Sequence, residues 1–379
     1  MVTGASNQTA TAANFADRDI RVGVVGYGLA GRVFHCPFIA AVPGLQLSGI
    51  VQRTGDSAAL AWPSATIHRS LDDLLASDVD LVVVATPNSD HAPMTMAALN
   101  AGKHVVVDKP MAGSWQQALA MESLAKKHGL MLAAFHCSRW HGDFLTLQSV
   151  LQHNALGRLV TIEAKMDRYK PSLRDSKWKE EESPQNGILM DLGPHMVDQM
   201  VALLGRPLSV IADVRRNRSG SKIADSFDLG MDFLHEDTPV SVRLQATLIA
   251  ASAGPRFVAH GTHGTFEKRG IDQQQGLLEA GAQVPSLDEA EVWWQEEEAF
   301  WGELTSADPS VPSQVTKQRI PTISSDYRGY YANIRDVLRG DAELAVTARD
   351  GARTVRLLEL ALQSSEEGRR ITVTDDDWN

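Results

Sequence analysis

Between Ile20 and about residue 137, short runs rich in Val and Ile alternate with helix-length amphipathic segments that begin at Ser or Asn and end at Gly. This alternation is typical of a parallel β-sheet whose strands are joined by crossover helices. The fourth run, Val79–Ala85, is apolar at nearly every position, as a strand covered on both faces must be. We therefore predict a doubly wound α/β domain. Its six strands are expected at Ile20–Val25, Leu45–Val51, Thr66–His68, Val79–Ala85, His104–Val107 and Leu130–Phe135.

After Cys137 the pattern changes, because one predicted helix, Phe144–Gln152, is followed by longer runs in which apolar and polar residues alternate. Consecutive strands without intervening helices predict an α+β domain with a large, mostly antiparallel sheet. One face of this sheet is expected to be open, either to solvent or to a second copy of the chain. The expected strands are Leu159–Tyr169, Leu208–Arg215, Ser226–Leu234, Val240–Ile249 and Arg256–Phe266, followed by helices at Tyr327–Leu338 and Ala348–Glu366 and a last strand at Ile371–Val373.

The composition excludes several classes of partner. The chain has 36 Lys and Arg against 47 Asp and Glu, and its net charge of -11 would repel nucleic-acid phosphates and anionic lipid headgroups. No apolar run approaches the length of a membrane-spanning helix, and the first residues lack the pattern of a secretory signal. The two cysteines, Cys36 and Cys137, are too few for a disulfide framework, which indicates a reducing cytoplasm, and no metal site is expected.

A glycine-rich segment, Gly26-Tyr27-Gly28-Leu29-Ala30-Gly31, directly follows the first predicted strand. Glycines at this spacing allow a tight turn and bring backbone amides against a pyrophosphate, so the segment predicts dinucleotide binding. The second strand ends at Gln52, Arg53 and Thr54, where NAD enzymes place a carboxylate for the ribose hydroxyls. A guanidinium and a hydroxyl favour NADP instead, with NAD possible. Arg53 could also stack on the adenine, and Asp56 could fold back toward the ribose.

Two further polar segments follow the fourth and fifth strands, at the sheet edge where ligands of such domains bind. Thr86-Pro87-Asn88, with His91, is either a cofactor contact or a simple turn. Asp108-Lys109-Pro110 follows the fifth strand. Because Lys109 ends an all-apolar strand, its ammonium is predicted to point into a cleft.

In the second half, a predicted helix begins at Asp191 and contains His195. A carboxylate four residues before a histidine can accept its ring N–H and leave the other nitrogen free as a base. The alternatives are that Asp191 is only a helix cap and that His195 is only a satisfied polar group. Further candidates for substrate contact, each of which could instead be structural, are His136, Arg139, Trp140, Arg168, Tyr169 and Asp198.

In their order and spacing, the glycine segment, Asp108-Lys109-Pro110 and Asp191-Leu-Gly-Pro-His195 resemble the Gfo/Idh/MocA oxidoreductases. The resemblance runs from about Ile20 to the end of the chain, and flanking segments such as Phe135-His-Cys-Ser-Arg-Trp are most similar to the NADP-linked scyllo-inositol dehydrogenase branch. The sequence departs from the family at Asp108, where Glu is usual, and at Cys36, where a small residue such as Ala is common.

The resemblance implies that Lys109 contacts both cofactor and substrate, that Asp191 and His195 complete the catalytic site, and that a cis peptide bond precedes Pro110. It implies a dehydrogenase that transfers a hydride between nicotinamide and a hydroxyl of a cyclic polyol or sugar. The same chemistry on another sugar, an anhydrosugar or a dihydrodiol remains open, as does a non-catalytic NADP(H)-binding sensor or regulator.

Together these patterns predict three segments of chain. Residues 1–19 are expected to be a mobile tail, residues 20–137 a dinucleotide-binding Rossmann domain, and residues 138–379 a domain for substrate binding and oligomerisation. We expect a homodimer or homotetramer formed through the second sheet.

Overall fold

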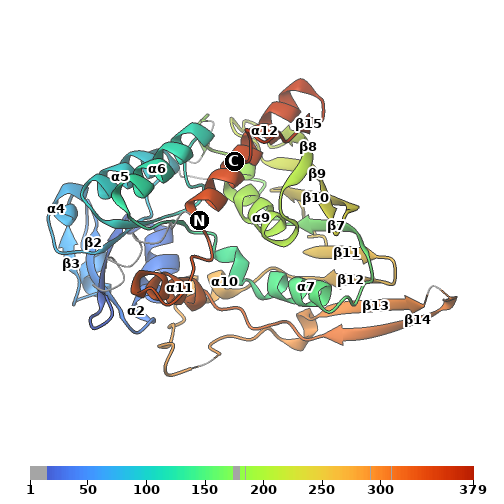
Figure 1. The fold of residues 1–379 in the computed structure, drawn as a ribbon, viewed down its shortest axis with the longest axis horizontal. Coiled ribbons are helices and arrows are strands. Elements are labelled where there is room, and N and C mark those ends of the chain that lie inside the picture. Colours follow the sequence, from blue (N-terminus) through green and yellow to red (C-terminus); the bar gives the residue numbers. More distant parts are fainter. Residues whose placement is uncertain (1–14, 174–179, 184, 291, 309) are drawn as a thin grey trace, which may run out of the picture. The chain divides into compact units, whose positions relative to one another are not determined.

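The computed structural model describes residues 15–173, 180–183, 185–290, 292–308 and 310–379, which form two compact units (Figure 1). The first unit contains the chain up to Cys137 together with Gln274–Trp293 and Asp326–Ala352, and the second contains the remainder. Most of the predicted N-terminal tail lies outside the described residues. The packed chain starts earlier than expected, because Phe15 is buried and Arg18 forms an ion pair with Asp80 at 2.7 Å.

The first unit is built on a six-stranded sheet in the order β3-β2-β1-β4-β5-β6, in which every neighbouring pair is parallel. This confirms the predicted doubly wound sheet, with central strands that are buried on both faces. The strands are β1 (Ile20–Val25), β2 (Leu45–Val51), β3 (Thr66–His68), β4 (Leu81–Val84), β5 (His104–Val107) and β6 (Leu132–Ala134).

Helices cover both faces of this sheet, and Figure 1 shows α5 and α6 side by side on one face, with α2 and α11 on the other. Predicted caps are present at α4 and α6, where the Ser70 and Ser114 side chains accept backbone N–H bonds, and α6 ends at Gly129 in the left-handed conformation. The helices are η1 (Ala30–His35), α2 (Cys36–Ala40), α3 (Ser57–Ala61), α4 (Leu71–Leu75), α5 (Asn88–Asn100), α6 (Trp115–His128), α10 (Gln274–Glu279) and α11 (Arg328–Arg339).

The segment that contains α11 belongs to the first unit because two adjacent tyrosines are buried there. The Tyr330 hydroxyl donates to the carbonyl of Ala134 in β6 at 2.9 Å, and the Tyr331 hydroxyl lies 2.6 Å from Nδ1 of His35. Both tyrosine rings also pack on Phe135. A single boundary at Cys137 would assign this segment to the second unit, although it packs in the first.

The second unit contains a nine-stranded sheet in the order β14-β13-β12-β11-β7-β10-β9-β8-β15. All neighbouring pairs are antiparallel except β7 and β10, so the predicted mostly antiparallel sheet is confirmed. The strands are β7 (Leu159–Lys165), β8 (Pro207–Arg215), β9 (Ser226–His235), β10 (Thr238–Thr247), β11 (Phe257–Gly261), β12 (Gly264–Lys268), β13 (Gly302–Asp308), β14 (Val311–Ile320) and β15 (Ile371–Thr372).

Two parts of this sheet differ from the sequence-based expectation. The single strand expected at Arg256–Phe266 is the hairpin β11–β12. A Cβ atom at Gly261 would lie 2.3 Å from the Leu156 carbonyl oxygen, and one at Gly264 would lie 2.7 Å from the Thr305 carbonyl oxygen, so both ends of the turn require glycine. The hairpin β13–β14 was not predicted, because the described side chains of β14 are almost all exposed and the strand therefore lacks apolar alternation.

One face of the nine-stranded sheet is apolar and packs on helices, whereas alternate residues make the other face polar. In β9, Phe227, Leu229, Met231 and Phe233 are buried in the same core as residues of α9 (Ile188–Leu204). The intervening positions include Asp228, which forms an ion pair with Arg243 of β10. Helices α7 (Gly142–Gln152) and α12 (Ala348–Glu367) and the short turns η2 (Cys137–Trp140) and η3 (Glu298–Phe300) complete the described elements.

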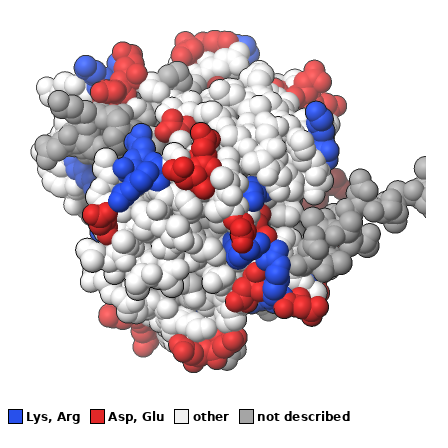
Figure 2. All heavy atoms as spheres, turned by 90° about the vertical axis from the view of Figure 1, so that its left-hand side faces the viewer, with Lys and Arg blue, Asp and Glu red and all other residues white. Residues whose placement is uncertain are grey.

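No helix in the part of the chain that the structure describes is long and apolar enough to cross a membrane. Basic and acidic side chains occur together in small groups on the face drawn in Figure 2. Cys36 and Cys137 are buried free thiols. Within the described ranges, no group of three or more His, Cys, Asp and Glu residues is placed to hold a metal ion.

Candidate functional site

The glycine turn after β1 has the geometry of a dinucleotide cradle. Gly26 has a φ of 102°, and a Cβ atom there would lie 2.6 Å from the Ala85 carbonyl oxygen. A Cβ atom at Gly31 would lie 2.0 Å from the Gly26 carbonyl oxygen, whereas one at Gly28 would meet nothing within 4 Å. Gly26 and Gly31 therefore allow the backbone to pack, and Gly28 leaves open space where a pyrophosphate could approach.

The helix that follows this turn starts with the π-helical segment η1 and continues as α2. The sequence predicts a helix at this position but not its π-form. Arg32 donates its backbone N–H to the Gly28 carbonyl at 3.0 Å, which ties the helix to the turn. The Tyr27 hydroxyl accepts the indole N–H of Trp62 at 3.1 Å, so the side chain beside the glycines is also held.

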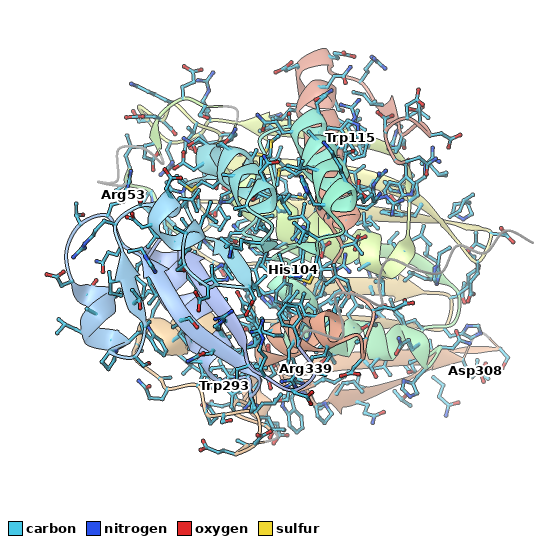
Figure 3. The ribbon with its side chains drawn as sticks, turned by 60° about the vertical axis from the view of Figure 1, so that its left-hand side comes forward. Arg53, His104, Trp115, Trp293, Asp308 and Arg339 are labelled. Carbon is cyan, nitrogen blue, oxygen red and sulfur yellow. The ribbon has the colours of Figure 1, made fainter. Side chains whose placement is uncertain are left out.

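At the end of β2, the residues predicted to contact the cofactor differ in whether other side chains and backbone groups hold them in place. The Gln52 amide group accepts the Ala58 backbone N–H at 2.8 Å and donates to Ser57 at 3.0 Å, so it is fixed to the start of α3. Arg53 and Thr54 are exposed, and Arg53 extends outward from the chain (Figure 3). An exposed guanidinium at this position is available for a 2′-phosphate.

Arg69, which follows β3, is a residue that the sequence reasoning missed. Its guanidinium donates to the Gln52 and Gly55 carbonyls at 3.0 and 2.7 Å and forms an ion pair with Asp56 at 2.7 Å. Arg69 thus organises the loop that carries Arg53, and its ion pair holds the Asp56 carboxylate within that loop. Its position directly after a strand, at the carboxyl edge of the sheet, is the sequence feature by which it could have been found.

The turn after β4 adjoins the glycine turn. The Thr86 Cγ2 atom would lie 3.3 Å from a Cβ atom at Gly26. The Thr86 hydroxyl is buried and has no hydrogen-bond partner within the described chain, as expected for a group that a ligand could bind. Pro87 precedes α5, and Asn88 is the first residue of that helix.

His91 is buried, and both its ring nitrogens face backbone carbonyls. Nδ1 lies 2.8 Å from the Pro110 oxygen, and Nε2 lies 2.9 Å from the Thr86 oxygen. Both ring nitrogens are therefore engaged within the first unit, and a cofactor contact by His91 stays a prediction.

Lys109 lies in the turn after β5, and its peptide bond to Pro110 is cis, as predicted. Its backbone N–H donates to Asp108 Oδ1 at 2.7 Å, while Asp108 Oδ2 lies 3.7 Å from His35 Nε2. Burial alone would raise the pKa of the Asp108 carboxyl, but His35 and the charges of Lys109 and His91 together hold that pKa below its usual value. Asp108 is thus an ionised group that belongs to the support of the turn.

In the second unit, α9 begins at Ile188, three residues earlier than expected, after Gly187 with a φ of 100°. Asp191 is therefore inside the helix and is not its cap, and Pro194 also lies inside the helix. Asp191 and His195 are one turn apart on one face, both half-buried. Arg168 Nη1 lies 4.0 Å from Asp191 Oδ2, which places a positive charge beside this carboxylate. The apolar side chains of Val197, Met200, Val201 and Leu204 in the same helix are buried.

Arg139 and Asp198, both predicted to contact substrate, bind each other. The Arg139 guanidinium donates to both Asp198 carboxylate oxygens, at 2.8 and 2.7 Å, and Asp198 is fully buried. Of the remaining candidates, His136 is buried, Trp140 accepts a hydrogen bond through its carbonyl from Ser325 at 3.0 Å, and Tyr169 is exposed.

A buried network beside this pair was not predicted. Gln199 donates to the Ser138 carbonyl at 2.7 Å and accepts from Arg256 at 2.7 Å, and Arg256 also pairs with Asp143 at 3.0 Å. This network ties α9 to β11 and to the start of α7. Such contacts join residues that are far apart in the sequence, so no local sequence pattern predicts them.

Two family models match this chain. The Gfo/Idh/MocA model described as an oxidoreductase family with an NAD-binding Rossmann fold matches residues 20–136, and the model described as the C-terminal alpha/beta domain of that family matches residues 148–373. The chain belongs to the Gfo/Idh/MocA oxidoreductase family. The protein is therefore an oxidoreductase, and its first unit is the nicotinamide-dinucleotide-binding Rossmann domain of the family.

Several members of the Gfo/Idh/MocA family are similar over nearly the whole chain. Uncharacterized oxidoreductase YdgJ of Escherichia coli is 36% identical and covers 92% of this chain and 97% of its own. The NADP(+) scyllo-inositol 2-dehydrogenase IolW of Bacillus subtilis is 34% identical, over 93% and 95%. The solved structure of the Bacillus subtilis oxidoreductase yvaA has a TM-score of 0.88 at 32% identity, over 94% and 99%.

Gly28 and Gly31 have different surroundings, so a methyl group added at each is predicted to have a different effect. We expect Gly28→Ala to leave the melting temperature unchanged and to weaken NADPH binding roughly tenfold or more, because the new Cβ occupies the space of the pyrophosphate. We expect Gly31→Ala to lower the melting temperature, because its Cβ would overlap the Gly26 carbonyl. Thermal unfolding and fluorescence titration with NADPH measure the two effects. Equal losses in both variants would show that Gly28 does not face the cofactor.

Proposed function

We propose that the chain is an NADP-dependent dehydrogenase that oxidises a hydroxyl of a cyclic polyol or sugar, with scyllo-inositol as the first substrate to test. The observation that carries the proposal is the position of Lys109, which follows β5 at the same sheet edge as the glycine turn and the Thr86 turn. The similarity to IolW supports the substrate class.

In this proposal, Lys109, Asp191 and His195 perform the proton chemistry. His195 removes the hydroxyl proton, and Asp191, one turn earlier in α9, holds the ring in the tautomer that leaves one nitrogen free. The Lys109 ammonium stabilises the negative charge that develops on the substrate oxygen. A bound NADP⁺ would supply the acceptor for the hydride that leaves the substrate carbon.

The cofactor preference rests on the exposed Arg53. Its guanidinium can form charge-assisted hydrogen bonds with a 2′-phosphate, and Arg69 holds the loop that presents it. Thr54 adds a hydroxyl at the same strand end. In this proposal the backbone groups of Gly26–Gly31 hold the pyrophosphate, and the Thr86 turn lies beside them.

Initial rates of nicotinamide reduction test the substrate and cofactor together. We expect turnover of scyllo-inositol with NADP⁺ to exceed that with NAD⁺, and Arg53→Ala to raise the KM for NADP⁺ roughly tenfold while leaving the KM for NAD⁺ unchanged. Myo-inositol, aldoses, an anhydrosugar and a dihydrodiol complete the substrate panel. Silence across the panel, from protein that binds NADPH, would contradict the proposed activity and favour a sensor.

His195→Asn tests the general base. We expect it to lower kcat by about 10²–10⁴-fold with little change in NADPH affinity, because the loss of a base affects the chemical step. His153→Asn, which changes an exposed histidine at the end of α7, is the matched control and should retain wild-type rates. Wild-type turnover by the His195 variant would remove this residue from the mechanism.

We further propose that the open face of the nine-stranded sheet joins copies of the chain into a dimer or tetramer. This face carries polar side chains from β7 to β10 and a hollow of about 370 Å³ that Lys165, Asp213, Arg215, Asp228 and Gln245 help to line. The proposal predicts a particle of at least twice 41.2 kDa by light scattering. Ser241→Arg, on the exposed side of β10, should release monomers, whereas Gln275→Arg on α10 should not. A monomeric wild-type chain would rule the interface out.

A further inference from the structure

We propose that His91 is a positioning residue that fixes the Lys109 turn against the Thr86 turn, so that the rate of the proposed reaction depends on a histidine that touches neither substrate nor cofactor. The inference deepens the proposed function and rests on it for the role of Lys109.

The first observation is that one buried ring joins two turns. His91 is 1% exposed and lies in the first turns of α5. Its Nε2 atom is 2.9 Å from the Thr86 carbonyl, which follows β4, and its Nδ1 atom is 2.8 Å from the Pro110 carbonyl, which follows β5. The imidazole therefore sets the spacing between the turn beside the glycine cradle and the turn that carries Lys109.

The second observation concerns the protons of this ring. A carbonyl oxygen only accepts hydrogen bonds, and a neutral imidazole has a single N–H to donate. Both ring nitrogens lie within hydrogen-bond distance of a carbonyl oxygen, so the ring is held between two acceptors. A buried side chain engaged on both sides in this way is well suited to hold backbone in place.

The third observation is that the same turn is held at its other end. The Tyr331 hydroxyl lies 2.6 Å from His35 Nδ1, and burial raises the pKa of this hydroxyl well above its ordinary value, so it stays protonated. The other ring nitrogen of His35, Nε2, lies 3.7 Å from Asp108 Oδ2. Lys109 thus lies between Pro110, whose carbonyl contacts His91, and Asp108, whose carboxylate has His35 beside it.

The alternative is that His91 only stabilises the first unit, like any buried and hydrogen-bonded side chain. His104 offers a matched comparison, because it is also a buried histidine of this unit and accepts the Met131 backbone N–H at 2.9 Å. It is the first residue of β5, whereas Lys109 follows the carboxyl end of that strand. Replacing His104 should therefore affect folding stability without moving the Lys109 turn.

The experiment compares His91→Phe and His91→Gln with His104→Phe in the full-length protein. Phenylalanine removes both ring nitrogens, and glutamine places a single amide group in their stead. We expect His91→Phe to lower kcat by about 10–100-fold with KM and NADPH affinity within about twofold, as displacement of a catalytic group does. The Gln variant should lie between Phe and wild type. His104→Phe should lower the melting temperature by a similar amount and leave kcat unchanged.

A double-mutant cycle decides whether His91 acts through Lys109. In a Lys109→Met background, His91→Phe should have no further effect on the residual rate, because the group that it positions is already gone. If His91→Phe lowered the rate equally in both backgrounds, or if both His91 variants kept wild-type kcat, the proposal would be overturned. If the Phe variant does not fold, the Gln variant carries the same cycle.

A readout without turnover separates this inference from the proposed function. The rate at which acetic anhydride modifies Lys109, measured by mass spectrometry relative to the exposed Lys317, should change at least about threefold in His91→Phe and remain unchanged in His104→Phe. If the wild-type protein oxidises no polyol but Lys109 responds in this way, the substrate proposal fails and the positioning role stands. An unaltered Lys109 rate in both His91 variants would overturn the positioning role.

Discussion

The close approach of backbone at the carboxyl ends of β1 and β4 is the constraint on which the first unit depends. Gly26 lies against the Ala85 carbonyl, and Gly31 lies against Gly26 itself, with no room for a side chain at either position. Because β4 is the neighbour of both β1 and β5, this packing brings the Thr86 turn beside the glycines and places Lys109 in the adjacent turn. The glycine turn and the position of Lys109 beside it are therefore products of strand order as much as of residue choice.

Much of this architecture could be predicted from the sequence, because its signals are local. Apolar runs of Val and Ile define the buried parallel strands, serines mark helix starts, and a single glycine spacing identifies the turn after β1. The polar residues that end these strands were found for the same reason, since an ionisable side chain such as Lys109 stands out after an all-apolar strand. The predicted ends of β4 and β6 differ from the observed ends by one or two residues. Apolar residues flank each of these strands, so the sequence pattern continues beyond the strand itself.

The support around the site could not be predicted, because it joins residues that are distant in the chain. Tyr331 and His35 are 296 positions apart, and Arg256 and Asp143 are 113 apart, so their pairing follows from the folded topology and leaves no periodic trace. The ion pair between Arg139 and Asp198, two residues predicted to contact substrate, shows the same limit. Their types suit a polyol, but the sequence does not reveal that the two charges form a pair with each other.

The return of α11 to the first unit has a consequence for how such a protein can be divided. A fragment that ends at Cys137 would keep all six parallel strands yet lose the tyrosines that cover Phe135 and complete the surroundings of His35. Its exposed aromatic surface would favour aggregation, and the Asp108 turn would lack part of its support. Exchanging the residues up to Cys137 between relatives at a single point is thus disfavoured. The fold is preserved when the chain is inherited as a whole.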